Sequence, residues 1–151
     1  MATKKNIEIK EISPEDRPFV SKLMTNSLIE EYGDPPTSEH IQNLLDYYYY
    51  KEISVIYVLK VNNIFAGFIW LIESSDVILG TSFYCAIYLA IEKEFRGQKY
   101  SKLLMDRAIE HCKENNVKQL RLTVRNNNIP ALNLYEQEGF HIYKHEMSLD
   151  F

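Results

Sequence analysis

The sequence contains few cysteines, no excess of positive charge and no apolar run of membrane-spanning length. Cys85 and Cys112 are the two cysteines in 151 residues. They are too few for a disulfide framework, so we expect free thiols in a reducing compartment. A formal net charge of −4 argues against a general nucleic-acid-binding protein. Because the basic start lacks the apolar segment of a secretory signal, we expect a cytoplasmic protein that binds neither nucleic acid nor membranes.

The sequence also lacks the motifs of several common kinds of active site. No Ser/His/Asp or Cys/His set suggests a nucleophile, and the phosphate-loop pattern Gly-x-x-x-x-Gly-Lys-Ser/Thr is missing. The four histidines have no metal-ligand spacing. They are His40, His111, His141 and His145. We therefore expect no metal, no covalent nucleophile and no phosphate-loop nucleotide hydrolysis.

Apolar residues recur with strand or helix spacing along the whole chain. The apolar fraction is 46% and the charged fraction 25%, which is ordinary for a globular protein, and the length suits one domain over residues 1–151. The periodicities predict the order β-α-α-β-β-β-α-β-α-β, which is typical of a mixed sheet with helices on both faces. Strands are expected at 7–9, 53–61, 64–72, 82–91 and 117–124, with one or two more after 140, and helices at 13–32, 37–50, 100–112 and 128–139.

A strand that turns directly into a helix lies near the middle of the chain. The apolar run 85–91 leads into Arg-Gly-Gln-Lys-Tyr-Ser-Lys-Leu-Leu-Met at residues 96–105, which opens an amphipathic helix. The first amides of a helix have no intrahelical partner, and the helix dipole is positive at that end, so the turn favours an anion such as phosphate. Arg96, Lys99 and Lys102 would strengthen such a site. The alternative is an ordinary connection whose basic side chains are solvated.

A second, short helix is marked at both ends. Asn128 is a favoured N-cap residue, and Pro130 falls in the first turn, where its missing N–H costs little. Gly139 can adopt the left-handed conformation that ends a helix, and Phe140 then returns the chain to a strand. We therefore predict a helix between Asn128 and Gly139.

Together the two segments resemble the acetyl-coenzyme A (acetyl-CoA) site of the GNAT (Gcn5-related N-acetyltransferase) superfamily. The later helix of that family commonly reads Asn-x-x-Ala-x-x-Leu-Tyr-x-x-x-Gly-Phe, and the chain matches every fixed position. The matching residues are Asn128, Ala131, Leu134, Tyr135, Gly139 and Phe140. The family's pyrophosphate loop, Gln/Arg-x-x-Gly-x-Gly/Ala, is matched in part. Arg96 fits, whereas Lys99 and Ser101 stand where the family prefers glycine and glycine or alanine.

The resemblance implies an α+β fold with a mixed, largely antiparallel sheet of six or seven strands. The fourth and fifth strands, here 82–91 and 117–124, would splay apart and hold the pantetheine arm of acetyl-CoA between them. The residues that would bind the cofactor are Leu89, Ile91, Arg96, Gly97, Gln98, Lys99, Tyr100, Ser101, Asn128 and Tyr135. Capping alone would explain Asn128, and core packing would explain the side chains of Leu89 and Ile91 equally well.

Acetyl transfer from a thioester to an amine needs a neutral amine, hydrogen-bond donors for the oxyanion and a proton for the leaving thiolate. Tyr135 matches the family position that supplies this proton, so the resemblance implies that Tyr135 is the general acid. A tyrosine that only packs in the core is the alternative. The general base stays open, because the strand 82–91 contains no carboxylate. The candidates are Glu30, Glu31, Glu73, Tyr84 and Tyr88, or a water chain alone.

An acceptor pocket is expected at the first two helices and their connection. Glu30, Glu31, Tyr32 and Asp34, with the tyrosines at 47–50, would give it an acidic and aromatic lining that suits a cationic amine. In the alternative, the acids are solvated and the tyrosines cover an edge of the sheet.

The resemblance therefore implies an N-acetyltransferase that moves an acetyl group from acetyl-CoA directly to a primary amine in an ordered ternary complex. The amine would belong to a small molecule or to a protein. The alternative is a non-catalytic acyl-CoA sensor or interaction module with the same fold. Lys99, Ser101 and the missing strand carboxylate favour that alternative. Many relatives pair as dimers, so a homodimer is left open.

Overall fold

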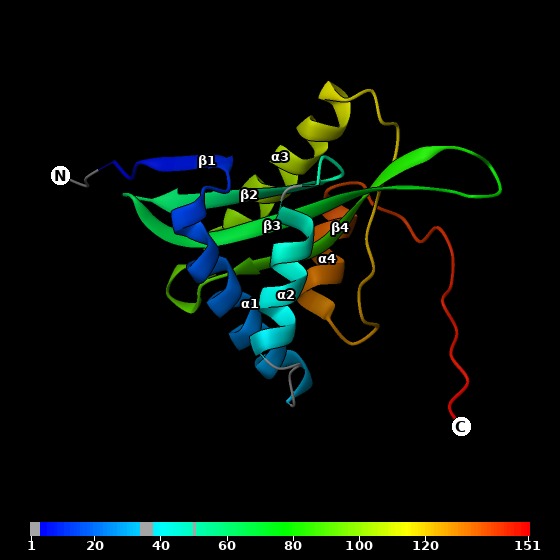
Figure 1. The fold of residues 1–151 in the computed structure, drawn as a ribbon, viewed down its shortest axis with the longest axis horizontal. Coiled ribbons are helices and arrows are strands. Elements are labelled where there is room, and N and C mark those ends of the chain that lie inside the picture. The colour runs from blue at the N-terminus through cyan, green and yellow to red at the C-terminus, as the bar shows by residue number, and fades with distance from the viewer. Residues whose placement is uncertain (1–3, 34–37, 50) are drawn as a thin grey trace.

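The computed structural model describes residues 4–33, 38–49 and 51–151. One mixed sheet contains five strands in the spatial order β1-β2-β3-β4-β5 (Figure 1). The first four strands are antiparallel neighbours, and β5 runs parallel to β4. The strands are β1 (Ile7–Glu11), β2 (Ser54–Val61), β3 (Ile64–Ser75), β4 (Ser82–Ile91) and β5 (Leu120–Arg121).

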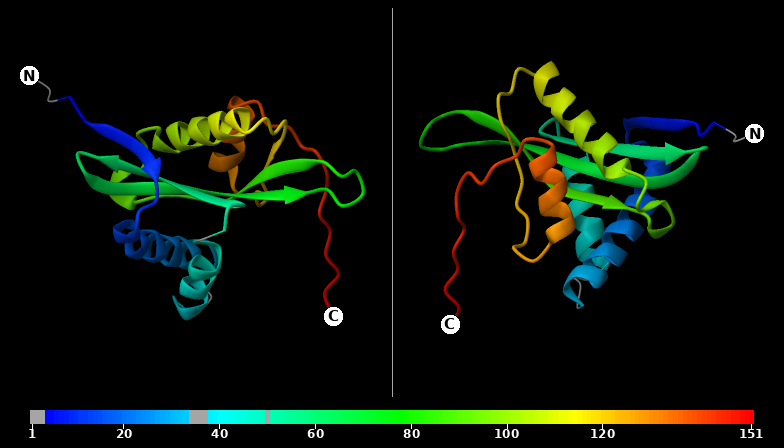
Figure 2. Two further views of the ribbon diagram at one scale, coloured as in Figure 1. Left: turned by 45° about the horizontal axis from the view of Figure 1, so that its top comes forward. Right: turned by 180° about the vertical axis from the view of Figure 1, so that it is seen from behind.

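Two pairs of helices cover the two faces of the sheet, which confirms the predicted layers (Figure 2). The helices α1 (Arg17–Tyr32) and α2 (Ser38–Tyr49) lie on one face, and α3 (Tyr100–Glu114) and α4 (Ile129–Gln137) lie on the other. Short 3₁₀ turns precede α1 at Pro14–Asp16 and follow β4 at Lys93–Phe95.

The alternation of side chains along β3 supplies both halves of the core. Phe68 and Trp70 pack toward α1 and α2, whereas Ile69 and Leu71 pack toward α3. All four are fully buried, because successive side chains of a strand point to opposite faces. The predicted turn at Asn62 and Asn63 joins β2 to β3, and both asparagines have positive φ, at 51° and 64°, as a tight hairpin turn requires.

The start of α1 is fixed to the sheet by a buried carboxylate. Asp16 is 2% exposed and accepts hydrogen bonds from the amide and hydroxyl of Ser13 at 3.0 and 2.7 Å. The Nζ of Lys60, on β2, lies 3.0 Å from the other carboxylate oxygen. Burial raises the pKa of Asp16, but the Ser13 hydrogen bonds and Lys60 outweigh it and leave the pKa below its usual value. This ion pair sets where α1 crosses the sheet.

A β-bulge in β4 changes which face its side chains reach. Leu71 pairs with Ala86 and Trp70 with Tyr88, so Ile87 has no partner on β3. Ala86 packs toward α3, whereas Tyr88 packs toward α1. An extra residue in one strand restarts the alternation in this way.

Beyond the bulge, β4 loses its partner on the other side. β5 pairs with β4 at Tyr84↔Leu120 and Cys85↔Arg121. Among the described residues no strand pairs with residues 86–91 of β4 on that side. We call this stretch the open edge of β4. The fourth and fifth strands separate as predicted, and the separation begins after the two residue pairs that join β4 to β5.

The predicted strand count of six or seven is wrong for the described chain, which has five. The strand expected at 117–124 is limited to Leu120–Arg121, because the chain leaves β4 immediately afterwards. No strand follows α4 in the part of the chain that the structure describes. The apolar residues of that tail, including Ile142 and Met147, are 78% and 91% exposed. Their alternation specifies an extended backbone, but a strand also needs a partner edge.

Candidate active site

The turn between β4 and α3 leaves a row of free backbone amides. Gly97 and Lys99 have φ values of 79° and 65°, which bend the chain into the first turn of α3. The amides of residues 97–102 donate to no acceptor among the described residues. Lys99 itself takes the left-handed conformation that glycine would favour. The turn therefore forms with lysine in place of glycine, and its donors can receive an anion.

The side chains of Gln98 and Tyr100 are directed to structural contacts. The Gln98 Oε1 accepts hydrogen bonds from the Lys5 Nζ at 2.6 Å and the Tyr100 hydroxyl at 3.3 Å. Tyr100 is 4% exposed and belongs to the core beneath α3. These two residues therefore offer a ligand mainly their backbone amides. Lys102 pairs with Asp106 at 2.8 Å and with Glu138, at the end of α4, at 3.4 Å.

Arg96 connects the turn to β4 and α1. Its Nε donates to the Ile91 carbonyl at 3.1 Å, and its two terminal nitrogens donate to the Glu30 carboxylate at 3.0 and 3.3 Å. The hydrogen bonds and charge of Arg96 hold the pKa of Glu30 below its usual value. Arg96 thus fixes the last turn of α1 beside the turn that opens α3.

Leu89 and Ile91 pack their side chains against the core on the α3 face. Opposite them on β3 stand Ile69 and Gly67. In an antiparallel ladder, the backbone groups of alternate residues point away from the paired strand. On the open edge of β4 these groups face no other strand of the described chain. The Ile91 carbonyl accepts from Arg96, and the other groups can pair with an extended ligand bearing amides.

Tyr135 lies on α4 and packs against the core on the α3 face of the sheet. The Asn128 Oδ1 accepts a hydrogen bond from the Ala131 amide at 3.3 Å, which confirms the predicted N-cap. Gly139 ends the helix region with φ 95°. The Tyr135 ring packs edge-on against Phe140, with centroids 5.7 Å apart. Burial raises the pKa of the Tyr135 phenol, and the charge of Glu31 raises it further. The phenol therefore keeps its proton at neutral pH.

Two of the candidate bases approach from the opposite face. Tyr88 stacks on Phe68 with centroids 5.9 Å apart, and burial, followed by the charge of Glu31, raises its pKa to about 12. Glu31 is exposed on the last turn of α1. The charge of Glu31 therefore acts on both phenols, although Glu31, Tyr88 and Tyr135 belong to α1, β4 and α4.

Two of the other candidate bases lie elsewhere, and the third is already paired. Glu73 faces Tyr84 in the β3–β4 register, and the Tyr84 ring lies 4.9 Å from that of His111, near the end of α3. This group is at the start of β4, before the open edge. Glu30 is close to the site but is paired with Arg96.

Arg125 is a residue that the sequence did not indicate. It lies between β5 and α4, and its guanidinium sits over the Tyr32 ring at 4.7 Å from the centroid. The contact links the end of α1 to the segment that leads into α4. No motif surrounds Arg125, and its place follows from the separation of β5 from β4. The bulge at Ile87 likewise had no sequence signal.

The tyrosines near residue 48 lie at the other end of α1, so the predicted joint lining of acids and tyrosines is wrong. Tyr48 packs edge-on against Trp70 at 5.9 Å, and Arg17 sits over the Tyr49 ring at 4.4 Å. Arg17 and Glu31 are 14 positions apart on one helix, or about 20 Å. Asp34 and Tyr50, also predicted to line the pocket, lie outside the described residues.

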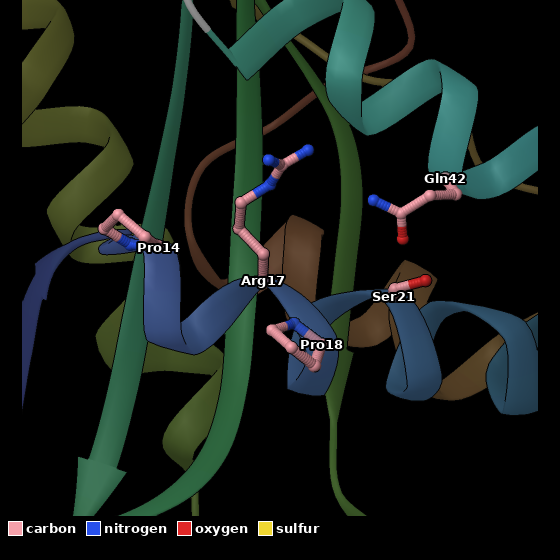
Figure 3. Close-up of a pocket in the computed structure, with 5 residues that line it drawn as sticks. All are labelled: Pro14, Arg17, Pro18, Ser21 and Gln42. Atoms are coloured by element: carbon pink, nitrogen blue, oxygen red, sulfur yellow. The ribbon is translucent and has the colours of Figure 1, made fainter.

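A pocket of about 450 Å³ lies at this far end, between α1 and α2 (Figure 3). Its lining residues are Pro14, Arg17, Pro18, Ser21 and Gln42. The Arg17 guanidinium is already paired with Asp46. This pocket is therefore separate from the candidate active site.

The family model for the GNAT acetyltransferase family matches residues 20–140, which include every element of the site. The chain belongs to the GNAT family. A Bacillus subtilis (strain 168) protein provisionally named [ribosomal protein bS18]-alanine N-acetyltransferase is 38% identical over 66 residues, which cover 37% of this chain and 44% of that protein. The chain thus spans less than half the length of this curated relative.

Solved structures share the GNAT fold over nearly the whole chain. An acetyltransferase candidate from Clostridium difficile 630 has a TM-score of 0.84 at 20% identity and covers 96% of this chain and 97% of its own. Another, from Clostridium acetobutylicum and solved with acetyl-CoA, has a TM-score of 0.78 at 16% identity, with 96% of both chains covered. At these identities the likeness concerns the fold alone.

Two further expectations concern metals and membranes. In the ranges that the structure describes, no three His, Cys, Asp or Glu side chains form a group that could hold a metal ion. No helix in these ranges is both long and apolar enough to span a membrane.

Proposed function

We propose that this GNAT protein is an N-acetyltransferase that moves an acetyl group from acetyl-CoA directly to a primary amine. The observation that supports this best is the convergence of three features. The free amides of residues 97–102 stand beyond the end of β4, the open edge of β4 leads toward them, and Tyr135, whose phenol keeps its proton, packs from α4 against the same core as Leu89 and Ile91. These three features match three parts of acetyl-CoA in turn: its diphosphate, its extended arm with amides and its departing thiolate.

Each group has one task in this proposal. The amides of 97–102 bind the diphosphate, and Lys99 adds an exposed positive charge beside it. Backbone groups at Leu89 and Ile91 bind the pantetheine arm. Asn128 caps α4 and thereby orients Tyr135. Acetyl-CoA supplies the activated acetyl group, and the Tyr135 hydroxyl donates its proton to the sulfur as the thiolate leaves.

The acceptor is proposed only as a primary amine. The curated relative carries the name of an N-acetyltransferase that acts on an alanine of ribosomal protein bS18, so a peptide with a free alanine amine belongs in the first set of acceptors to test. A cytoplasmic location, a single domain over residues 1–151 and homodimer formation stay predictions from the sequence.

A non-catalytic acyl-CoA sensor is the second candidate. It is favoured by β4 itself, which carries no carboxylate between Ser82 and Ile91. Such a sensor would be stabilised by acetyl-CoA in thermal unfolding but would release no thiol with any amine. This outcome would contradict the enzymatic proposal.

The decisive variant is Tyr135→Phe, with Tyr143→Phe on the exposed tail as the matched control. We expect Tyr135→Phe to lower turnover by about 10²–10⁴-fold, because the thiolate loses its proton donor. Free thiol is measured over a panel of primary amines, and acetyl-CoA affinity by calorimetry. The affinity should stay close to that of the wild type. Unchanged turnover in Tyr135→Phe would remove Tyr135 from the mechanism.

A further inference from the structure

The GNAT site needs a route by which the acceptor amine loses its proton, and the sequence left open five side chains or a water chain alone. The five side chains differ in their positions and contacts in the structure. Glu30 is held by Arg96 through two hydrogen bonds. Glu73 and Tyr84 lie at the start of β4 beside His111. Tyr88 keeps its proton because burial raises its pKa to about 12.

Glu31 is the remaining candidate, and the turn that bears it is fixed on three sides. Arg96 ties the neighbouring Glu30 to the start of α3. Tyr88 of β4 packs against the cluster that α1 contributes to, and the Ser27 side chain, one turn earlier on α1, lowers the Tyr88 pKa. Arg125 lies over the ring of Tyr32, the next residue. A carboxylate on such a turn is positioned by its neighbours while its own side chain stays exposed.

The electrostatic neighbours of Glu31 are the groups around the reaction. Of the described carboxylates, Glu31 is the one whose charge raises the pKa of both Tyr88 and Tyr135. Tyr135 is the proposed proton donor to sulfur. The last turn of α1, which bears Glu31, is tied to the turn that opens α3 through Glu30 and Arg96, and α1 packs on the face of the sheet opposite to that of Tyr135.

We propose that Glu31 binds the acceptor as a primary ammonium cation and accepts the proton that this cation must lose before attack. The inference rests on the proposed acetyltransferase function. It names the acceptor class as basic aliphatic amines, because an exposed carboxylate attracts a primary ammonium cation through charge and charge-assisted hydrogen bonds.

The reaction balances with these groups alone. The ammonium R–NH₃⁺ gives one proton to the Glu31 carboxylate, and the free electron pair of R–NH₂ attacks the thioester carbon. The C–N bond forms and the C–S bond breaks, and the thiolate takes the proton of Tyr135. The nitrogen then returns a proton to Tyr135 as the amide forms. Glu31 releases its proton to solvent, so that ammonium and thioester yield amide, thiol and one proton.

The test compares Glu31→Gln with two amines of similar size, ethylamine and 2,2,2-trifluoroethylamine. Ethylamine is a cation at neutral pH and must be deprotonated, whereas the fluorinated amine is already neutral. We expect Glu31→Gln to lower kcat/KM for ethylamine by about 10²–10³-fold, and for the fluorinated amine by less than about 10-fold. Glu31→Asp should recover part of the ethylamine activity. Glu110→Gln, on the exposed face of α3, is the matched loss of charge and should behave as wild type.

The outcomes distinguish this inference from the function on which it rests. Equal losses for both amines, or no loss for either, would overturn the role of Glu31. In that case wild-type turnover and its loss in Tyr135→Phe would still support the acetyltransferase. A wild-type protein that binds acetyl-CoA but releases no thiol with any amine would overturn both. Acetyl-CoA affinity, measured by calorimetry, should be unchanged in Glu31→Gln, and a large loss of affinity would assign Glu31 to the cofactor site instead.

Discussion

Replacing Lys99 by glycine should stabilise the fold and weaken acetyl-CoA binding at the same time. Lys99 has φ 65° and ψ 22°, a conformation that costs a residue with a Cβ about 1–2 kcal/mol. Glycine avoids this cost but loses about 0.5–1 kcal/mol more backbone entropy on folding. The net gain is about 0.5–1 kcal/mol, which corresponds to a Tm increase of about 1–4 °C for a chain of this size. Removal of one exposed positive charge beside the diphosphate should weaken binding by about two- to fivefold.

Asn116→Gly is the matched control at the other end of α3. Asn116 is also left-handed, with φ 56°, but asparagine tolerates this conformation at lower cost, so the gain should be clearly smaller. Thermal unfolding followed by circular dichroism gives Tm, and calorimetry gives the affinity. A lower Tm for Lys99→Gly, or an equal gain in both variants, would refute the argument from backbone strain. Tighter binding of acetyl-CoA would mean that the lysine side chain obstructs the phosphates.

Two further predictions concern the sheet and its pH response. In Gly67→Ala the new Cβ would lie 2.5 Å from the Ala90 carbonyl oxygen, so β3 and β4 must separate; we expect a loss of about 1–3 kcal/mol in urea unfolding, and an unchanged midpoint would contradict this. His111 hydrogen-bonds the Tyr57 hydroxyl at 2.7 Å, and burial, with the charge of Arg107, lowers its pKa. The unfolded chain, whose histidine pKa is about 6.5, therefore binds the proton more readily. The contribution of His111 to the free energy of unfolding should be complete above about pH 6.5 and should fall as the pH drops through that value. This pH dependence should be absent in His111→Gln. Equal pH profiles of stability for the two proteins would contradict the prediction.

Local sequence signals predicted the elements that depend on neighbouring residues. The helix α4 was found from Asn128 and Gly139, and the β2–β3 turn from Asn62 and Asn63, because caps and tight turns are set by a few adjacent side chains. The sequence did not predict the length of β5, because this length depends on how far β4 runs beside a chain segment about 35 residues away. The prediction of strands after α4 was wrong for the same reason, because alternating apolar residues do not supply a partner strand.

The residues of the site show the same difference between local motifs and contacts of distant segments. Arg96 and Tyr135 belong to continuous motifs and were identified as candidates from the sequence. The position of Glu31 was not distinguishable from that of Glu30, although adjacent residues of a helix point about 100° apart. That difference decides which of the two meets Arg96 and which affects Tyr135. Arg125 was missed because its contact with Tyr32 joins segments that share no local pattern.

The bulge and the early end of β5 together explain how groups from both faces can act on one reaction. In an unbroken sheet the backbone layer would separate Glu31, on the α1 face, from Tyr135, on the α4 face. Here β5 leaves β4 after Cys85, and the bulge at Ile87 turns Tyr88 toward α1. The charge of Glu31 raises the pKa of the Tyr135 phenol, although the two residues belong to opposite faces. In the proposed mechanism, Tyr135 as acid and Glu31 as base would thus approach one thioester from opposite sides without sharing an element or a neighbouring stretch of sequence.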